Sequence, residues 1–455
     1  MKSFRPLRRA GQIALGLAGV AALALALPGM AEAKIFGGKP KPTTPTVGNR
    51  IPILSRVESG AKVDPDIAAV AVVLPPPEVN VAWGQGGGAA NKAYGHVALG
   101  EAPQQVWNAS IAGMTPSRRL GAAPVIGDGR LFAMDTNGVL HAYDAASGKV
   151  LWAHKFQPRG DSAPVVFGGG ASLDGGKVYI TTGAGEVAAL DADSGKLRWS
   201  VQPAGPLRGA PTLAFGAVYV MTQNNEIHAL NADDGVELWQ ESGSLGATGV
   251  FGVAAPAAGQ GTVVAGYSTG ELVAYRYENG RQLWSDALAR TSLSTSVGVL
   301  TDIDADPIIE RGRVYALGQG GRMAAYELVT GQRIWELNLA GISTPAIAGE
   351  WIFTLTDDAK LLCIARTTGK VRWITQLERW KNEKKKNGAI YWTGPVLAGN
   401  RLWLANSRGE IFAVSPTDGV PGRYAHLKAG VTLAPVVANS TLYVLDDSGR
   451  ITAFK

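Results

Sequence analysis

Two short motifs in the sequence have residue types that catalysis or metal binding would require. Gly266-Tyr267-Ser268-Thr269-Gly270 matches the pattern in which a nucleophilic serine sits on a sharp turn between a strand and a helix. Residues 271–275 have the composition of a strand, so the helix that such a turn requires is not predicted. Residues 302–306 begin like a calcium loop, but the sixth position is Pro307 instead of glycine and the twelfth is Arg313 instead of glutamate. Neither a hydrolase nor a metal site is therefore predicted.

One cysteine and five histidines complete the set of side chains that are often reactive. Cys363 stands in the apolar run Leu361-Leu362-Cys363-Ile364, which predicts a buried small side chain instead of an exposed thiolate. His141 and His228 occupy equivalent positions of a repeated segment, which favours a structural role over metal binding. These side chains therefore predict no catalytic residue, no metal site and no cofactor.

The first 33 residues have the three parts of a secretory signal peptide. Three arginines among residues 5–9 precede an apolar stretch over residues 13–27, and Ala31-Glu32-Ala33 forms a cleavage motif before Lys34. We expect export and removal of residues 1–33; an uncleaved anchor is the alternative, because the apolar stretch approaches the length of a membrane span. No cysteine stands near the end of this stretch, so a lipid anchor on an N-terminal cysteine is not expected.

Residues 34–80 are predicted to be a tether. The segments Lys39-Pro40-Lys41-Pro42 and Pro75-Pro76-Pro77 favour an extended polyproline conformation and offer little to a core. Two interpretations of the apolar piece 67–74 stay open, a short strand and a segment that docks on the domain.

One pattern recurs about every 45 residues over residues 81–455. Each unit opens with a proline and a short apolar strand, continues through two tight turns, and ends in an Ala-x-Asp-x-x-x-Gly-Lys-x-x-Trp segment or a variant of it. In six copies a glycine stands four residues before the tryptophan. These copies end at Trp152, Trp199, Trp239, Trp284, Trp335 and Trp373. Four strands repeated at this period predict a propeller blade, with the tryptophan wedged between neighbouring blades.

Eight opening prolines predict eight blades, of which the last lacks its final strand. The missing strand is predicted at residues 104–108, because Trp107 precedes Trp152 by one period. We therefore expect an all-β, eight-bladed β-propeller with four-stranded antiparallel blades, its ring closed by an N-terminal strand.

The repeat is similar to that of pyrroloquinoline-quinone (PQQ) dehydrogenases and their non-enzymatic relatives. Those dehydrogenases usually carry a vicinal cysteine pair near the quinone, which a chain with one cysteine cannot supply. Two further stretches, residues 205–216 and 300–307, resemble signatures of the BamB family of outer-membrane β-barrel assembly factors, and residues 83–96 are similar to its alphaproteobacterial members.

In that family the two loops bind the periplasmic POTRA domains of the barrel subunit BamA. The resemblance implies that Leu207, Arg208, Asp302 and Asp304 are partner-binding residues; Gly205 stands where the family pattern has a leucine. It also implies a non-enzymatic periplasmic scaffold without a cofactor, at the inner face of the outer membrane and held there by its partner. Unfolded outer-membrane proteins are a further candidate partner.

Two alternative functions stay open. One is a PQQ-dependent, dehydrogenase-like quinoprotein. The other is an envelope-binding module that uses the lysine-rich loop over residues 381–386, where several ammonium groups create a local positive potential. Nucleic acid is not an expected partner of an exported protein, and the formal charge of +6 is modest.

Overall fold

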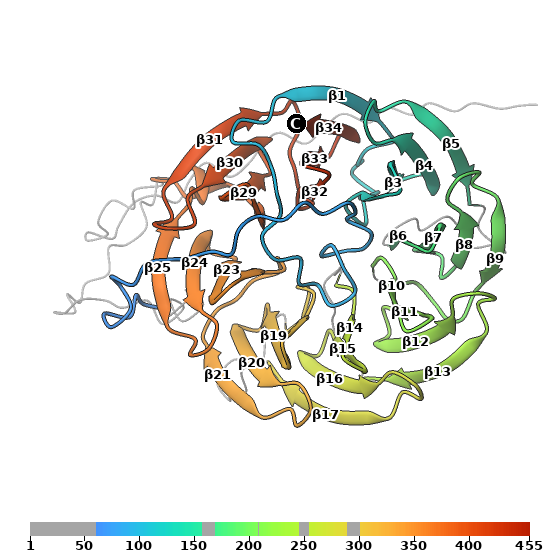
Figure 1. Ribbon diagram of the computed structural model, residues 1–455, viewed down its shortest axis with the longest axis horizontal. Helices are drawn as coiled ribbons and strands as arrows, with labels where there is room; N and C mark the ends of the chain where they lie inside the picture. The colour runs from blue at the N-terminus through green and yellow to red at the C-terminus, as the bar shows by residue number, and fades with distance from the viewer. Residues whose placement is uncertain (1–60, 157–168, 208, 245–253, 289–300) are drawn as a thin grey trace, which may run out of the picture. The chain divides into compact units, whose positions relative to one another are not determined.

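The computed structural model describes residues 61–156, 169–207, 209–244, 254–288 and 301–455, so the predicted signal peptide lies outside the described residues (Figure 1). The described residues form eight four-stranded antiparallel sheets, arranged as the blades of a β-propeller, and one two-stranded hairpin. The predicted all-β, eight-bladed propeller with four-stranded antiparallel blades is therefore confirmed. None of these residues forms a helix long and apolar enough to cross a membrane.

The first four blades follow one another along the chain, and each runs from the inside of the ring outwards (Figure 1). Their strands are β2 (Val125–Gly127), β3 (Arg130–Met134), β4 (Val139–Asp144) and β5 (Val150–Lys155); β6 (Gly169–Asp174), β7 (Lys177–Thr182), β8 (Val187–Asp191) and β9 (Leu197–Val201); β10 (Thr212–Ala214), β11 (Ala217–Met221), β12 (Glu226–Asn231) and β13 (Glu237–Ser242); β14 (Ala257–Gly259), β15 (Thr262–Gly266), β16 (Glu271–Arg276) and β17 (Gln282–Ala287).

The next three blades repeat this order, and a hairpin lies between the sixth and seventh. The strands are β18 (Ile308–Glu310), β19 (Arg313–Gly318), β20 (Arg322–Glu327) and β21 (Arg333–Leu337); β22 (Ala346–Ala348), β23 (Trp351–Leu355), β24 (Lys360–Ala365) and β25 (Val371–Gln376); the hairpin β26 (Trp380–Asn382) and β27 (Asn387–Ala389); β28 (Trp392–Ala398), β29 (Arg401–Asn406), β30 (Glu410–Val414) and β31 (Pro421–His426).

The eighth sheet joins strands from distant parts of the sequence. It consists of β32 (Val436–Ala438), β33 (Thr441–Leu445), β34 (Arg450–Phe454) and β1 (Gln105–Ser110). β1 runs antiparallel to β34, with Gln105 opposite Phe454 and Ser110 opposite Arg450.

The turns between the second and third strands of a blade depend on side-chain acceptors. In the first blade, Asp135 Oδ1 accepts hydrogen bonds from the amides of Asn137 and Val139, at 2.8 and 2.9 Å. Gly138 closes this turn with a φ of 74°, in the left-handed region that glycine adopts without steric cost. In this hairpin a short polar residue and a glycine therefore fix where the chain reverses; Asn225 and Ala359 take the place of the glycine in the third and sixth blades.

The repeated tryptophans lie between blades, which confirms their predicted position. Each ring covers the turn glycine of the next blade, and its indole N–H donates to a carbonyl of the same turn. These pairs are Trp107 with Ala145, Trp152 with Ala192, Trp199 with Ala232, Trp239 with Tyr277, Trp284 with Leu328, Trp335 with Arg366 and Trp373 with Pro416. Every wedge thus buries apolar area and satisfies its own polar atom.

The residue opposite each tryptophan is small. Alanine pairs with tryptophan in six of the described blades, whereas Cys363 takes this place opposite Trp373. Cys363 is fully buried and unpaired, and burial raises the pKa of its thiol. Its chemistry is therefore that of a small apolar side chain, as the sequence predicts.

Gly195→Ala should destabilise the chain more than Gly129→Ala does. Both glycines have a positive φ, 68° and 72°, so alanine costs about 1–2 kcal/mol in backbone strain at either position. A methyl group on Gly195 would also lie 2.6 Å from the Trp152 ring, whereas one on Gly129 would meet nothing within 4 Å. Overpacking adds about 1–3 kcal/mol to the first variant alone. Urea titrations of both variants check this, and equal midpoints would contradict the tight wedge.

The chain reaches the ring from outside the sixth blade. Figure 1 shows residues 61–72, in blue, beside β25, and the chain then crosses that blade towards the centre. Val72 is buried in the core shared by the sixth and seventh blades, and Ile67 and Leu74 pack against the same core without forming a strand. Of the two interpretations of residues 67–74, the docking segment is the one observed.

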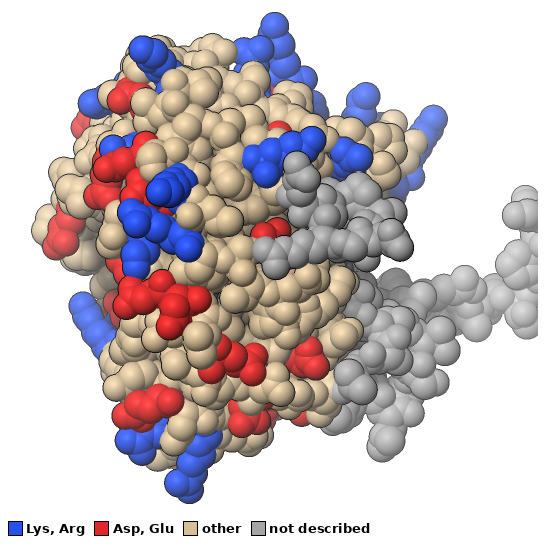
Figure 2. All heavy atoms as spheres, turned by 90° about the vertical axis from the view of Figure 1, so that its right-hand side faces the viewer, with Lys and Arg blue, Asp and Glu red and all other residues tan. Residues whose placement is uncertain are grey.

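Charged side chains of both signs are mixed on the outer rim. On the side of the ring shown in Figure 2, Lys and Arg alternate with Asp and Glu. Some link neighbouring blades, such as Arg130 with Asp193 at 2.6 Å and Lys177 with Asp233 at 2.7 Å. This side has no continuous basic stripe of the kind that binds nucleic acid.

Candidate functional site at the centre of the ring

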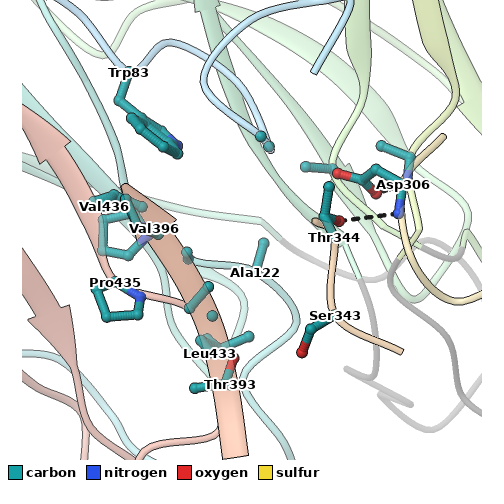
Figure 3. Close-up of a pocket in the computed structure, with 18 of the residues that line it drawn as sticks. Trp83, Ala122, Asp306, Ser343, Thr344, Thr393, Val396, Leu433, Pro435 and Val436 are labelled. Carbon is teal, nitrogen blue, oxygen red and sulfur yellow. Dashed lines mark hydrogen bonds between the residues drawn. The ribbon is translucent and has the colours of Figure 1, made fainter. Parts of the chain in front are cut away.

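A cavity of about 220 Å³ lies where the eight sheets converge. All eight blades contribute to its wall through their first strands or the loops that lead into them. Figure 3 shows Pro435, Val436, Val396 and Ala122 on one side and Thr344 and Asp306 opposite them. The surface is mostly apolar, with a few polar groups from the loops.

Residues 83–98, which we call the axial segment, cross the centre of the ring (Figure 1) and form the floor of this cavity. Trp83 and Ile126 of β2 exchange two main-chain hydrogen bonds, and Gln85 exchanges two with the main chain of Leu213 in β10. Further carbonyls of the segment accept amides from other blades: Gly84 from Leu173, Ala90 from Ala258, Asn91 from Ile309 and Val97 from Gly399. The segment therefore satisfies the inner edges of six blades.

Lys92 anchors the axial segment from inside. Its ammonium group is buried and donates to the carbonyl of Gly86 at 2.9 Å and to the Thr212 hydroxyl at 3.1 Å. Asp306, in the loop before β18, accepts from the amide of Ala255 at 2.7 Å. Burial lowers the pKa of Lys92 and raises the pKa of Asp306, while the attraction between the opposite charges opposes both shifts. The centre of the propeller thus contains two buried groups of opposite charge that influence each other without a direct ion pair.

The mouth of the cavity has exposed apolar and hydroxyl side chains. Ile342 is 49% exposed, an unusual position for a large aliphatic side chain on a loop. It precedes Ser343 and Thr344, and the Thr344 hydroxyl accepts a hydrogen bond from the amide of Asp306 at 3.0 Å (Figure 3). Apolar groups around a few fixed polar groups are typical of binding sites.

Of the first pair of predicted partner residues, Leu207 and Arg208, the structure describes only Leu207. Leu207 is fully buried among Trp199, Val218 and Val220, so its side chain supports the loop from below. Arg208 lies outside the described residues. Ala210, at the end of the same loop, lines the central cavity. The sequence pointed to the loop over residues 205–216. Burial of Leu207 depends on how the backbone of this loop runs, which the repeat pattern does not show.

The second pair lies beside the same cavity. Asp304 is largely buried and lines the cavity wall, next to Asp306. Asp302 is buried as well, and its carbonyl accepts a hydrogen bond from the amide of Gln319 at 2.9 Å. The loops that contain the predicted residues therefore reach one cavity, through Ala210 and Asp304.

Several residues of this site have no distinctive sequence signal. Lys92 and Asp306 are 214 positions apart in the sequence, and Ile342 is one of many isoleucines. Ile342 is distinctive only because it is exposed, and the sequence alone does not show exposure. The proximity of Lys92 and Asp306 depends on the tertiary fold, because they belong to distant segments.

The motifs that resembled catalytic sites have structural roles. Ser268 lies in the turn between β15 and β16, where its amide and hydroxyl donate to Asn225 Oδ1 at 3.1 and 3.0 Å. His141 pairs with Asp135 at 3.0 Å, and His228 with Glu237 at 2.7 Å. The strand after Ser268 confirms that this motif is not a nucleophile turn.

The lysine-rich loop forms the tip of the β26–β27 hairpin. Residues 381–388 are exposed, and the hairpin pairs Trp380 with Ala389 and Asn382 with Asn387. Exposed ammonium groups at a hairpin tip are compatible with solvation or with an anionic surface. The hairpin geometry neither supports nor excludes the envelope-binding alternative.

A family model described as "Outer membrane protein assembly factor BamB" matches residues 94–169 and 165–375. Curated proteins of that name are also similar to the chain. The protein from Escherichia coli (strain K12) is 28% identical over 353 residues, which cover 77% of this chain and 88% of that protein. The protein from Yersinia pestis is 26% identical over 357 residues, with the same coverage.

Solved structures share the propeller fold. The crystal structure of BamB from Moraxella catarrhalis superposes with a TM-score of 0.64 at 21% identity, covering 78% of this chain and 99% of that one. A quinohemoprotein alcohol dehydrogenase from Comamonas testosteroni gives 0.66 at 15% identity, covering 88% and 83%. At these identities the superpositions establish the fold alone, because the same fold hosts enzymes and assembly factors.

Proposed function

The chain belongs to the family of the outer membrane protein assembly factor BamB, and on that premise we propose that it is a non-enzymatic scaffold subunit of the β-barrel assembly machinery. It is exported to the periplasm, binds the periplasmic POTRA domains of a BamA-type barrel, and aids folding and insertion of outer-membrane proteins. The partner holds it at the inner face of the outer membrane. The observation that carries the proposal is the match of the family model over residues 94–375, which include both predicted loops.

The proposed contact surface is the mouth of the central cavity with its surrounding loops. Arg208 supplies a guanidinium group for charge-assisted hydrogen bonds to a partner. Asp302 and Asp304 shape the opposite loop, and Leu207 supports the first loop from within the core. Because Leu207 is buried, we place the apolar anchor of this surface at the exposed Ile342.

Arg208→Ala combined with Asp302→Ala should abolish co-purification of the BamA-type barrel with the tagged chain. Truncating hot-spot residues of an interface costs about 2 kcal/mol or more each, which lowers affinity by more than tenfold. A pull-down from detergent-solubilised envelopes measures the partner, and thermal unfolding of the purified variant reports whether the fold survives.

Because Asp302 is buried, a surface variant tests the same proposal without risk to folding. Ile342→Asp should reduce partner recovery at least tenfold. Ile334→Asp is the matched control, since Ile334 is also exposed but lies on the outer strand β21. Undiminished recovery with Ile342→Asp and with the folded double variant would exclude this interface.

The dehydrogenase alternative fits the cavity poorly. PQQ is a tricarboxylate, and binding it favours cationic side chains near its carboxylates. The described residues that line the cavity include Asp304 and Asp306 but no lysine, arginine or histidine. The cavity is also smaller than the usual range of about 300–1,000 Å³ for small-molecule sites. PQQ-dependent dye reduction by the purified chain with calcium present would revive this alternative.

A further inference from the structure

The outer edge of one blade is already occupied by an extended piece of this chain. Val63 forms a parallel bridge with Val371, the first residue of β25. The amide of Asp64 donates to the carbonyl of Val371 at 2.8 Å, and the Arg372 guanidinium donates to the carbonyl of Val70 at 2.6 Å. The edge of a blade can therefore accept a short segment through one main-chain hydrogen bond and a bond from the Arg372 side chain, before the segment turns at residues 65–69.

A lysine next to this edge binds two carboxylates of the docked segment. The Lys370 ammonium group lies 2.6 Å from Asp66 Oδ2 and 3.3 Å from Asp64 Oδ2. Asp64 Oδ1 also accepts the amide of Asp66 at 2.9 Å, which holds both carboxylates on one side of a tight turn. The docked element is thus an apolar residue followed by two aspartates with one residue between them.

Two other blades have the same edge sequence without an occupant among the described residues. Gly369-Lys370-Val371 recurs as Gly148-Lys149-Val150 in β5 and as Gly195-Lys196-Leu197 in β9. Val371 is 2% exposed beneath the docked segment, whereas Val150 is 57% exposed and Leu197 is 42% exposed. The exposed fractions of these equivalent residues differ because a docked segment covers the side chain in β25 and none of the described residues covers it in β5 or β9.

The edge of β5 is the better open site. Leu151 is exposed beside Val150, and the Lys149 ammonium group forms no ion pair with any described residue. In β9, Arg198 binds Asp191 at 2.7 Å, whereas Leu151 stands in place of this arginine in β5, where Lys149 attracts the carboxylate of Asp144. Figure 2 views this side of the ring, where uncharged surface lies between basic and acidic side chains.

We propose that the outer edge of β5, formed by Lys149, Val150 and Leu151, is a docking site for an extended segment of a partner protein. The segment carries an apolar residue followed by two carboxylates with one residue between them. It pairs its main chain with Val150 and its carboxylates with Lys149. The site lies on the rim, away from the central cavity, and does not depend on the function proposed above.

A free peptide is expected to bind weakly, because single exposed ion pairs contribute little and a tether supplies much of the effective concentration. Disulfide trapping in a glutathione redox buffer suits such a site. The single native cysteine, Cys363, is buried, so Val150→Cys introduces one accessible thiol in the full chain. The probe is a peptide with the sequence of residues 61–72 and cysteine in place of Val63.

The matched control protein is Glu237→Cys. Glu237 occupies the position of Val150 in the third blade, but Val236 stands there in place of the lysine. We expect the Val150→Cys chain to trap at least fivefold more probe than the control. The advantage should disappear with Asn in place of both peptide aspartates, and with Lys149→Glu.

Two results would overturn the proposal. Equal trapping of the probe and of a scrambled peptide with the same composition would mean charge attraction without a site. A wild-type chain that dimerises in a concentration-dependent way, and that the cysteine-free peptide dissociates, would make the occupant a second copy of this chain instead of a partner protein.

Discussion

Lys92→Met is expected to lower the free energy of unfolding by about 3–5 kcal/mol, because it removes two buried hydrogen bonds of a charged group and the positive charge that opposes the burial of Asp306. Asp306 would keep the amide of Ala255 but lose the ammonium group that offsets its burial. The axial segment would also lose the two hydrogen bonds from Lys92 to Gly86 and Thr212. Urea denaturation followed by tryptophan fluorescence measures the change.

The double variant Lys92→Met with Asp306→Asn should recover part of the loss, since it removes the uncompensated carboxylate. Lys384→Met, at the exposed hairpin tip, is the matched control and should change the stability by less than about 0.5 kcal/mol. A double variant as unstable as the sum of the two single variants would show that Lys92 and Asp306 are not coupled.

The loss in Lys92→Met should also depend on pH. Burial raises the pKa of Asp306 above its unfolded value, and removing Lys92 removes the charge that lowers it. A carboxyl with a raised pKa does not lower folding stability at a pH where it is protonated in both the folded and the unfolded chain. The loss of stability grows as the pH rises above the pKa of the unfolded chain. The deficit of Lys92→Met should therefore be smaller near pH 4 than at pH 7. A deficit that is constant over this range would contradict a charged Asp306 in the variant.

Trp335→Ala is expected to cost about 3–5 kcal/mol, the usual range for removing a large aromatic ring from a core. The ring fills the contact between the fifth and sixth blades, beside Ile364 and Val371, and covers Gly369. Its indole N–H donates to the carbonyl of Arg366 at 2.8 Å. Calorimetry or denaturant titration measures the loss, and the transition should also become less cooperative because adjacent blades separate.

Trp335→Phe separates the two contributions of this wedge. Phenylalanine keeps most of the apolar contact and loses the hydrogen bond, so the expected cost is about 1–2 kcal/mol. Trp380→Ala is the control on the hairpin β26–β27, where the ring is only half-buried. Equal losses in Trp335→Ala and Trp380→Ala would mean that the wedge does not hold the blades together.

Prediction from the sequence worked where a residue's environment repeats. The six copies that end in tryptophan, the turn glycines and the small residues opposite the rings each recur at a fixed offset, so a local pattern predicts their packing. Cys363 is correctly predicted as buried from its apolar run, and the structure adds that it replaces an alanine of the repeat. Ser268 is correctly kept out of a catalytic role because the next residues form β16.

Prediction was weaker where a residue's environment comes from a distant segment. Leu207 is expected at a surface, yet it supports its loop from inside the core. Residues 61–72 are expected in a tether, yet they dock beside β25. In both cases the position of the residues depends on contacts with distant parts of the chain. The local sequence does not reveal these contacts.

The sequence by itself determined the architecture and the family resemblance, because a hydrophobic pattern of fixed period leaves each blade one way to bury its apolar face and its tryptophan. Only the tertiary structure decided how the centre and the rim are used. The fold brings Lys92 near Asp306, 214 residues away in the sequence, and gathers loops of eight blades at one cavity. Among the described residues it also leaves Val150 of β5 exposed, while Val371 of β25 is covered. These features arise from long-range contacts, whose partners no local periodicity specifies.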